Sequence, residues 1–497
     1  MVATRRVAWL GWATLIGAAS LLLAESCAGP RTVGLAPEPA PAGPVPPGRE
    51  LWVDAHAPEG GDGTAARPLR RLTDALDVPA PARRVHLLPG LYPGPFVAPD
   101  GTELVGGSAA VLTAEGGATV LEARGSVSLR RLLVQGGAVG IDVTGNVSLE
   151  DVRLSGQRLV GVAVGPGAAF QARGTVLEAS VTEAVGLLLG PGTRSALSGL
   201  TFEGPWRRGI EARAPERLLV ERTRFRGSLT ALHQRDGSVE LSDIAISEGR
   251  GPGLYVVGGE LRLRRVQVQG QEYALLTGTG ASVEAEDLTS SRADRAGVGV
   301  VNARARFTRL VITEAGTFGG LQGVTSEVTV QGLAVSDIAG HGVSMRGGSL
   351  TVDGGTVRRT HDPEGAGGDG LQLRGGRAVL QGLTVEDTAG SCLVAAEAVE
   401  ATVVQSTLVR CRTAGLVVET AAHLSASEVS VRTTGGPAAV ATGDARLVLR
   451  GFSATSAAEG LLWAECSAGA RVTASDVRGT LPVLPCVEVL RAPPGAP

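Results

Sequence analysis

The amino-acid sequence predicts an all-β solenoid, and three observations carry the prediction. An eight-residue pattern, apolar-x-apolar-x-x-apolar-x-apolar, recurs 16 times between the copy that begins at Val127 and the copy assigned to Ala470. The spacing between the first residues of successive copies is nearly constant, and a fixed period of about 20 to 23 residues is typical of solenoids. The chain also has 72 glycines among 497 residues, which suits a structure with many sharp corners.

Each repeat consists of short strands. In copies such as VELSDIAI from Val239, apolar and polar residues alternate, which places the apolar side chains on one face of a strand. About a dozen residues after most copies begin, a small residue precedes a second apolar run, as in GIDV at Gly140 and GVSM at Gly342. A repeat therefore holds at least two strands, and three fit its length.

A right-handed parallel β-helix of about 17 coils fits this repeat better than a leucine-rich repeat does. A leucine-rich repeat needs an Asn or Cys at a fixed position of every copy, whereas this chain has only two Asn residues, Asn146 and Asn302. In a β-helix each coil contacts only its neighbours, so the chain can grow without a larger core. We therefore expect one long domain over residues 108–490, about 80 Å in length at a strand spacing near 4.8 Å.

The first 49 residues are expected to lie outside the solenoid. Residues 1–27 contain two arginines, an apolar stretch and then LAESC, and they resemble the signal peptide of bacterial lipoproteins. The resemblance implies export, lipidation of Cys27 and an anchor in the outer membrane of the cell envelope. A general secretory signal that is cut nearby is the alternative. Residues 28–49 are rich in proline and should form an extended tether, and residues 491–497 form a Pro-rich tail.

Residues 50–107 resemble the entry segment of bacterial pectin-lyase-fold proteins. The resemblance rests on LWVDAHAPEGGDGTAARPLRRLTDALD followed by VHLLPGLYPGPFVAPDGTELVGG. It implies a short helix at Arg71–Leu76 that caps the open end of the first coil, where the core would otherwise be exposed. It implies a fold and no single activity, because this fold includes polysaccharide lyases, hydrolases, epimerases and proteins without catalysis.

Four cysteines follow the export signal, and all lie in the last quarter of the chain. Cys466 and Cys486 are separated by one coil, so their Cα atoms should lie close enough for a disulfide. Cys392 and Cys411 are one residue closer in sequence and fit the coil less well, so their disulfide would need a corner loop. Cysteines in an exported chain favour disulfides, and these spacings do not suit a metal site.

Composition narrows the possible chemistry. All 46 basic residues are arginine, which excludes a lysine base or Schiff-base amine. The net charge of -3 and the scattered arginines form no basic patch, so nucleic acid is not an expected partner. Only 3% of residues are aromatic, which leaves few ring faces for sugars.

The candidate site lies where the repeat is interrupted. The copy that begins at Leu350 runs further than the others before the next begins at Ala378, and the surplus falls at THDPEGAGGDG, residues 360–370. Aligning the coils across this insertion places HGVSMRGG from His341 beside DGLQLRGG from Asp369. Arg346 would then lie beside Arg374. An insertion in a solenoid leaves the rod as a loop, often on the binding face.

A histidine beside a carboxylate could perform acid–base chemistry on a sugar acid, with Asp369 orienting His341 and the two arginines binding a carboxylate. GHGVSM from Gly340 resembles the Gly-His-Gly motif of polygalacturonase-type glycoside hydrolases, although their Asn-Thr-Asp, Asp-Asp and Arg-Ile-Lys motifs are missing here. The simpler interpretation is a surface histidine paired with an aspartate. Asp362, Glu364 and Asp369 are the candidate ligands of a cation, for which calcium is the suitable ion.

Two functions from different classes follow. The first is a non-catalytic envelope lipoprotein whose rod binds an envelope protein or a polysaccharide. The second is a carbohydrate-active enzyme, a lyase, hydrolase or epimerase, with its site near the 360–370 loop.

Overall fold

The computed structural model describes residues 48–490 apart from 108, 364 and 366. The export signal with Cys27, nearly all of the 28–49 tether, the 491–497 tail and Glu364 therefore lie outside the described residues. Within the described part, strands dominate, and helix is confined to α1 (Leu72–Leu76) and the single turn η1 (Cys466–Ala468).

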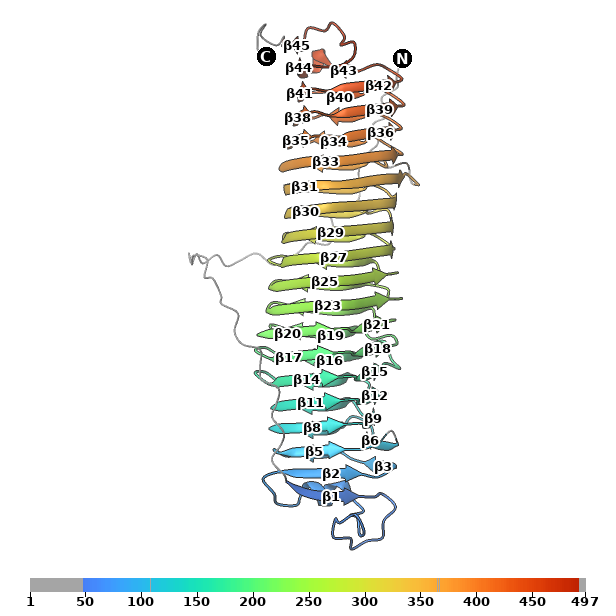
Figure 1. Ribbon diagram of the computed structural model, residues 1–497, viewed down its shortest axis with the longest axis vertical. Coiled ribbons are helices and arrows are strands. Elements are labelled where there is room, and N and C mark those ends of the chain that lie inside the picture. Colours follow the sequence, from blue (N-terminus) through green and yellow to red (C-terminus); the bar gives the residue numbers. More distant parts are fainter. Residues whose placement is uncertain (1–47, 108, 364, 366, 491–497) are drawn as a thin grey trace, which may run out of the picture. The chain divides into compact units, whose positions relative to one another are not determined.

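The strands form a parallel β-solenoid of about 17 turns, of the right-handed type (Figure 1). Most turns contribute one strand to each of three stacks, as the repeat length suggests. The first stack contains β1 (Arg49–Val53), β2 (Arg83–Leu87), β5 (Thr102–Val105), β8 (Ser126–Arg130), β11 (Asn146–Glu150), β14 (Ala169–Arg173), β17 (Arg194–Ser198), β20 (Arg217–Glu221), and later β35 (Glu400–Val404), β38 (His423–Ser427), β41 (Arg446–Arg450), β44 (Arg471–Ser475) and β45 (Val487–Val489).

The second stack contains β3 (Gly90–Pro93), β6 (Ala110–Ala114), β9 (Leu133–Gly136), β12 (Arg153–Ser155), β15 (Val176–Glu178), β18 (Thr201–Glu203), β21 (Arg224–Arg226), and later β36 (Thr407–Cys411), β39 (Ser430–Thr434) and β42 (Ser453–Ala457). Between these groups the first and second stacks share long strands: β23 (Ser238–Ser247), β25 (Glu260–Gln269), β27 (Ser282–Ala293), β29 (Arg304–Ala315) and β33 (Arg377–Thr388). The strands β30 (Leu321–Ala339) and β31 (Val343–His361) run through all three stacks.

The third stack contains β4 (Phe96–Ala98), β7 (Thr119–Ala123), β10 (Val139–Val143), β13 (Val160–Val164), β16 (Val185–Leu189), β19 (Arg208–Arg213), β22 (Thr230–Arg235), β24 (Pro252–Val257), β26 (Tyr273–Thr277), β28 (Val298–Val301), β32 (Leu371–Arg374), β34 (Leu393–Ala396), β37 (Leu416–Val418), β40 (Ala439–Ala441) and β43 (Leu462–Ala464). This stack corresponds to the second apolar run of each repeat.

Each copy of the eight-residue pattern begins in the first stack and ends in the second, as Val127 in β8 and Val134 in β9 show. Leu261 pairs in register with Val239 on one side and with Val283 on the other, as the equivalence of the copies requires. The assignment of the last copy is wrong, because Leu447 pairs with Val472 and not with Ala470. The turn η1 lies in this coil and lengthens the connection before β44.

The small residue of the second signature lies at or next to the start of a third-stack strand, where neighbouring coils are closely packed. A Cβ on Gly140 would lie 2.5 Å from the carbonyl oxygen of Gly161, and a Cβ on Gly161 would lie equally close to the carbonyl oxygen of Gly186. These distances are too short for a carbon–oxygen contact. The small residue of the second signature is therefore a steric requirement in these coils, although alanine occupies the same position at Ala231 and Ala274.

The helix predicted at Arg71–Leu76 is confirmed as α1, with Arg71 at its N-cap. Its residues Leu72, Ala75 and Leu76 are buried, and the helix contacts β1 and β4 at the first coils (Figure 1). No helix in the part of the chain that the structure describes is long and apolar enough to cross a membrane.

Both predicted disulfides are present, and in each the Cα atoms are 5.3 Å apart. Cys466 and Cys486 join the last two coils. Cys392 occupies the small-residue position before β34, and Cys411 ends β36 of the following coil; both are buried. This second disulfide thus crosses an interior corner. Disulfides are typical of proteins that fold in an oxidising compartment outside the cytoplasm.

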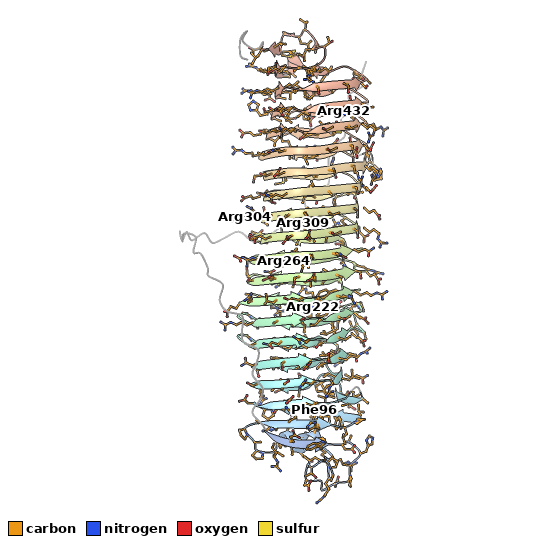
Figure 2. The ribbon with its side chains drawn as sticks, in the orientation of Figure 1. Phe96, Arg222, Arg264, Arg304, Arg309 and Arg432 are labelled. Carbon is orange, nitrogen blue, oxygen red and sulfur yellow. A yellow bond between two sulfur atoms is a disulfide. The ribbon has the colours of Figure 1, made fainter. Side chains whose placement is uncertain are left out.

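Charged residues of alternating sign occupy one corner between the first and second stacks. Asp243, Arg265, Asp287 and Arg309 follow one another in successive coils, and all have a left-handed backbone with φ between 52° and 58°. Arg265 donates hydrogen bonds of 2.6 and 2.7 Å to the two carboxylate oxygens of Asp243, and Arg309 binds Asp287 in the same way. Figure 2 shows the side chains of the described residues and labels Arg309. We call these four residues the corner ladder.

Candidate functional site

The inserted loop leaves the coils on either side of it in phase. Arg346 of β31 pairs in register with Arg374 of β32, as the alignment across residues 360–370 predicts. His341 and Asp369 lie just before these strands, at the same corner of neighbouring coils. The backbone N–H of Gly342 donates to the carbonyl oxygen of Asp369 (3.0 Å), which fixes the two corners against each other.

His341 and Asp369 contact each other. His341 Nδ1 lies 3.4 Å from Asp369 Oδ2, and the backbone N–H of Asp369 donates to the same Nδ1 at 3.3 Å. The other carboxylate oxygen, Oδ1, accepts the backbone N–H of Ser391 in the next coil at 2.8 Å. The two side chains are only 19% and 13% exposed. The structure therefore holds an oriented, largely buried imidazole–carboxylate pair at the surface of the rod.

Burial is the main influence on both groups. It lowers the pKa of His341, while the attraction of the Asp369 carboxylate opposes the fall. It raises the pKa of Asp369, while the attraction of His341 opposes the rise. Because burial penalises charge on either partner, it favours the neutral form of each group. An acid–base pair with one mobile proton is the chemistry that this arrangement can support.

The two arginines occupy different environments. Arg374 forms an ion pair with Glu397, with Nη1 2.7 Å from Oε1, so its guanidinium is already engaged. Its positive charge nevertheless reaches the pair: it adds to the effect of burial that lowers the pKa of His341, and it opposes the effect of burial that raises the pKa of Asp369. The Arg346 side chain is exposed. The structure thus places both predicted arginines beside each other but shows neither in contact with His341 or Asp369 among the described residues.

The described residues do not test the proposed three-carboxylate cation site. Among the described residues no group of three His, Cys, Asp or Glu side chains is arranged to hold a metal ion. Asp362 influences the pKa of both His341 and Asp369 electrostatically. Glu364 lies outside the described residues, so the three-carboxylate set remains a prediction.

An aromatic and cationic cluster lies on the coils just before His341. The guanidinium carbon of Arg295 lies 4.4 Å from the ring centroid of Phe318 and 5.9 Å from that of Tyr273, which is the range of cation–π contacts. Phe318 belongs to the coil immediately before that of His341. The sequence analysis did not predict this cluster. Tyr273, Arg295 and Phe318 follow one another at the spacing of one coil, and this spacing indicates that they lie side by side.

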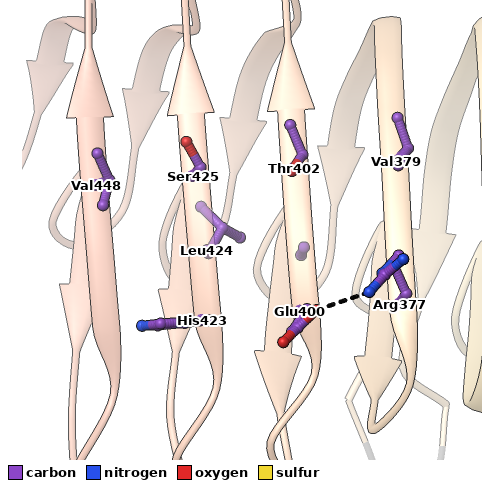
Figure 3. Close-up of a pocket in the computed structure, with 9 residues that line it drawn as sticks. Arg377, Val379, Glu400, Thr402, His423, Leu424, Ser425 and Val448 are labelled. Atoms are coloured by element: carbon purple, nitrogen blue, oxygen red, sulfur yellow. Dashed lines mark hydrogen bonds and ion pairs between the residues drawn. The ribbon is translucent and has the colours of Figure 1, made fainter.

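A shallow groove lies on the first stack, across β33, β35, β38 and β41 (Figure 3). Its volume is about 270 Å³, and Arg377 Nη2 and Glu400 Oε2 form an ion pair of 3.3 Å within it. It is lined by Arg377, Val379, Glu400, Ala401, Thr402, His423, Leu424, Ser425 and Val448. The groove is separate from the His341–Asp369 pair, which precedes strands of the third stack. Its hydroxyl and charged groups can form hydrogen bonds to a polar ligand.

Comparison with known proteins gives no family assignment. No protein-family model and no curated protein matches the chain. Among solved structures, tailspike protein 3 of bacteriophage CBA120 aligns with 81% of this chain and 58% of its own, at 11% identity and a TM-score of 0.26. The chain therefore spans little more than half of that tailspike.

Two glycoside hydrolases are similarly distant. The catalytic unit of a GH87 alpha-1,3-glucanase from Streptomyces thermodiastaticus aligns with 88% of this chain and 69% of its own, at 14% identity and a TM-score of 0.25. The GH136 lacto-N-biosidase from Eubacterium ramulus aligns with 89% of this chain and 68% of its own, at 9% identity and a TM-score of 0.22. These values are too low to transfer an activity.

Proposed function

We propose that the protein is an envelope-anchored rod that presents a binding surface and catalyses no reaction. The observation that carries the proposal is the continuous strand stack from β1 to β45, which has a helix over its first coils and a disulfide in its last two. Each coil of such a solenoid is supported by its neighbours, so length is gained without a larger core. A body of this kind is suited to hold a surface at a fixed distance from an anchor.

The anchor is the lipid on Cys27, with the Pro-rich segment as spacer. The full chain, expressed in a bacterium with an outer membrane, should then fractionate with that membrane. Mass spectrometry should find a mature N-terminal peptide that begins at Cys27 and carries acyl chains. Cys27→Ala should release the chain from the membrane fraction. A mature N-terminus at another residue, without acyl mass, would contradict the anchor.

The partner is a polysaccharide or an envelope protein that contacts the outer face of the rod. The groove on the first stack supports this, because Glu400, Thr402 and Ser425 offer polar groups along successive strands. Binding of the immobilised full chain to envelope polysaccharides should weaken in a Thr402→Ala, Ser425→Ala double variant. The matched control is a Ser128→Ala, Ser148→Ala double variant, which changes paired residues of the same stack far from the groove. Equal binding by both variants would exclude the groove.

The second candidate is a carbohydrate-active enzyme that uses the His341–Asp369 pair, and the contact between these two side chains favours it. The full chain is incubated with a panel of acidic polysaccharides, with and without calcium, and new reducing or unsaturated ends are measured. Turnover that is lost in His341→Ala and retained in the control His56→Ala, which removes an exposed histidine outside both sites, would establish catalysis and overturn the rod proposal. Absence of turnover over the whole panel would count against the enzyme.

A further inference from the structure

Three neighbouring coils bring charged and aromatic side chains together on the third stack. Glu211 of β19 pairs in register with His233 of β22, and His233 pairs with Tyr255 of β24. Two residues further along the strands, Arg213 pairs with Arg235. Residues two apart on a strand share a face, so these five side chains lie on one surface. We call them, together with Arg208, the arginine patch.

Glu211 organises two of the arginines. Its side chain is 1% exposed, Arg208 Nη1 lies 2.6 Å from Oε2, and Arg213 Nε donates to Oε1 at 2.8 Å. Burial acts to raise the pKa of the Glu211 carboxyl, but the hydrogen bonds from the two guanidiniums outweigh it and the pKa is lowered. Glu211 is therefore ionised at neutral pH and fixes both guanidiniums in place.

His233 lies beside this ion cluster with an unused polar atom. His233 is only 3% exposed. Its Nδ1 atom is buried and has no hydrogen-bond partner in the described part of the chain. The ring stacks on Tyr255, with centroids 5.1 Å apart. Burial, followed by the positive charges of Arg208 and Arg235, lowers the pKa of His233 to about 4. The ring of His233 is thus neutral at pH 7 and adds no positive charge beside the guanidiniums.

The patch carries more positive than negative charge. Arg208 and Arg213 share the single carboxylate of Glu211, and the guanidinium of Arg235 forms no hydrogen bond or ion pair with any residue between 48 and 490 that the structure describes. Arg213 and Arg235 are like charges side by side in register, which is unfavourable. In the corner ladder, by contrast, neighbouring charges have opposite sign. The arginine patch therefore has an excess of positive charge that a bound anion would neutralise.

We propose that the arginine patch binds an oxyanion between Arg213 and Arg235, with His233 beside it. The ligand is a carboxylate, sulfate or phosphate group, because planar guanidiniums bind pairs of such oxygens. The group can be a free ion or can belong to an acidic polysaccharide, and these sources share the same chemistry at the site. The inference is independent of whether the rod is catalytic, since the His341–Asp369 pair lies on other coils.

Isothermal titration calorimetry of the full chain with sodium phosphate and sodium sulfate, at an ionic strength held constant with sodium chloride, tests the proposal. We expect saturable one-to-one binding that weakens at least tenfold in Arg235→Gln. Arg235 is exposed, so this variant should fold, and circular dichroism checks that it does. The control Arg304→Gln removes the same charge from an exposed position on the first stack and should bind as the parent does.

A second arm distinguishes the two sources, with polygalacturonate as the polymeric carboxylate and dextran as the neutral polymer. Binding of phosphate or sulfate that depends on Arg235 supports a site for free ions. Binding of polygalacturonate alone, again dependent on Arg235, supports a group carried by a polymer. The proposal is overturned if no anion binds the parent saturably, or if Arg235→Gln and Arg304→Gln lose binding equally.

Discussion

The two buried histidines of the rod differ in the charges that they face. His341 faces a carboxylate, and the attraction of Asp369 opposes the effect of burial on the pKa of His341. His233 faces mainly guanidiniums, whose repulsion adds to the effect of burial and outweighs the single carboxylate of Glu211. His233 is therefore held neutral far below the pH at which a free histidine gains its proton. A residue of this kind makes stability depend on pH.

Between pH 7 and pH 4, His233 should make the folded protein less stable as pH falls. The pKa of His233 is about 4 in the folded chain, against an ordinary value near 6.5 in the unfolded chain. Between pH 6.5 and pH 4, His233 is therefore protonated in the unfolded chain and neutral in the folded chain. This difference lowers the free energy of unfolding by at most about 3 kcal/mol.

Thermal unfolding of the parent and of His233→Gln at pH 7 and pH 4.5 measures this effect. From pH 7 to pH 4.5, the midpoint temperature of unfolding should fall less in His233→Gln than in the parent. His423→Gln, which removes an exposed histidine, should behave as the parent. Equal losses in the parent and in His233→Gln would show that His233 does not cause the pH dependence.

At the scale of the element, the long strands from β23 to β29 turn a corner without glycine. Asp243, Arg265, Asp287 and Arg309 adopt a left-handed backbone that favours glycine, because the Cβ of other residues crowds the following carbonyl. Each of these residues also has a neighbour of opposite charge one coil away. The ion pairs of the corner ladder thus offset backbone strain, and they align the strands on either side of the corner.

Arg265 separates these two contributions. Arg265→Ala keeps the backbone strain and loses the ion pair with Asp243, whereas Arg265→Gly loses both. We expect the midpoint of thermal unfolding to fall in Arg265→Ala by about 1–2 °C and to stay within about 1 °C of the parent in Arg265→Gly. Scanning calorimetry at low salt and at 0.5 M sodium chloride, where screening weakens the ion pair, provides the comparison. A glycine variant less stable than the alanine variant would contradict the assignment.

At the scale of the whole molecule, the two ends of the solenoid are protected differently. The first coils are covered by α1, whose apolar residues complete the core. Within the described residues, β45 is the last strand and pairs only with β44; Val489 at its end and the following Leu490 remain 56% and 50% exposed. A terminal coil with one neighbour should open before the others. The disulfide between Cys466 and Cys486 ties this coil to the one before it.

Loss of that disulfide should therefore loosen the C-terminal end and leave the middle of the rod unchanged. Closing a loop of about 20 residues is worth roughly 3 kcal/mol in the chain-entropy model. In Cys486→Ala, amides of β44 should exchange with deuterium faster than in the parent, while those of β25 exchange at the same rate. Under reducing conditions the difference between parent and variant should vanish. Unchanged exchange in β44 under oxidising conditions would contradict the role of the disulfide.

Much of the fold could be predicted because one periodicity determines it. The copies of the apolar pattern occupy equivalent positions in successive coils, so the length of one coil also predicted the contact between Cys466 and Cys486. Alignment of the coils placed His341 beside Asp369, because the inserted loop leaves the coils around it in phase. The assignment at Ala470 failed where η1 changes the length of a coil, since a fixed period cannot detect an irregular turn.

The arginine patch was not predicted, for a physical reason. ALHQRD from Ala231 matches no known motif, and neither the clamp on Glu211 nor the burial of His233 can be read from one strand. Both follow only when three third-stack strands are placed side by side. The corner ladder can be recognised in the sequence, because Asp243 and Arg265 have opposite charges and are separated by one coil.

The corner ladder also limits how the length of this rod can change. Its signs alternate, so its repeat is two coils although the repeat of the strands is one. Removal of one coil would place Asp243 beside Asp287, whereas removal of two would place it beside Arg309 and restore an ion pair. Viable changes of length in this region should therefore come in steps of two coils, or about 10 Å. The alternation of charge along the corner ladder thus restricts the lengths that this stretch of the rod can adopt to those that differ by an even number of coils.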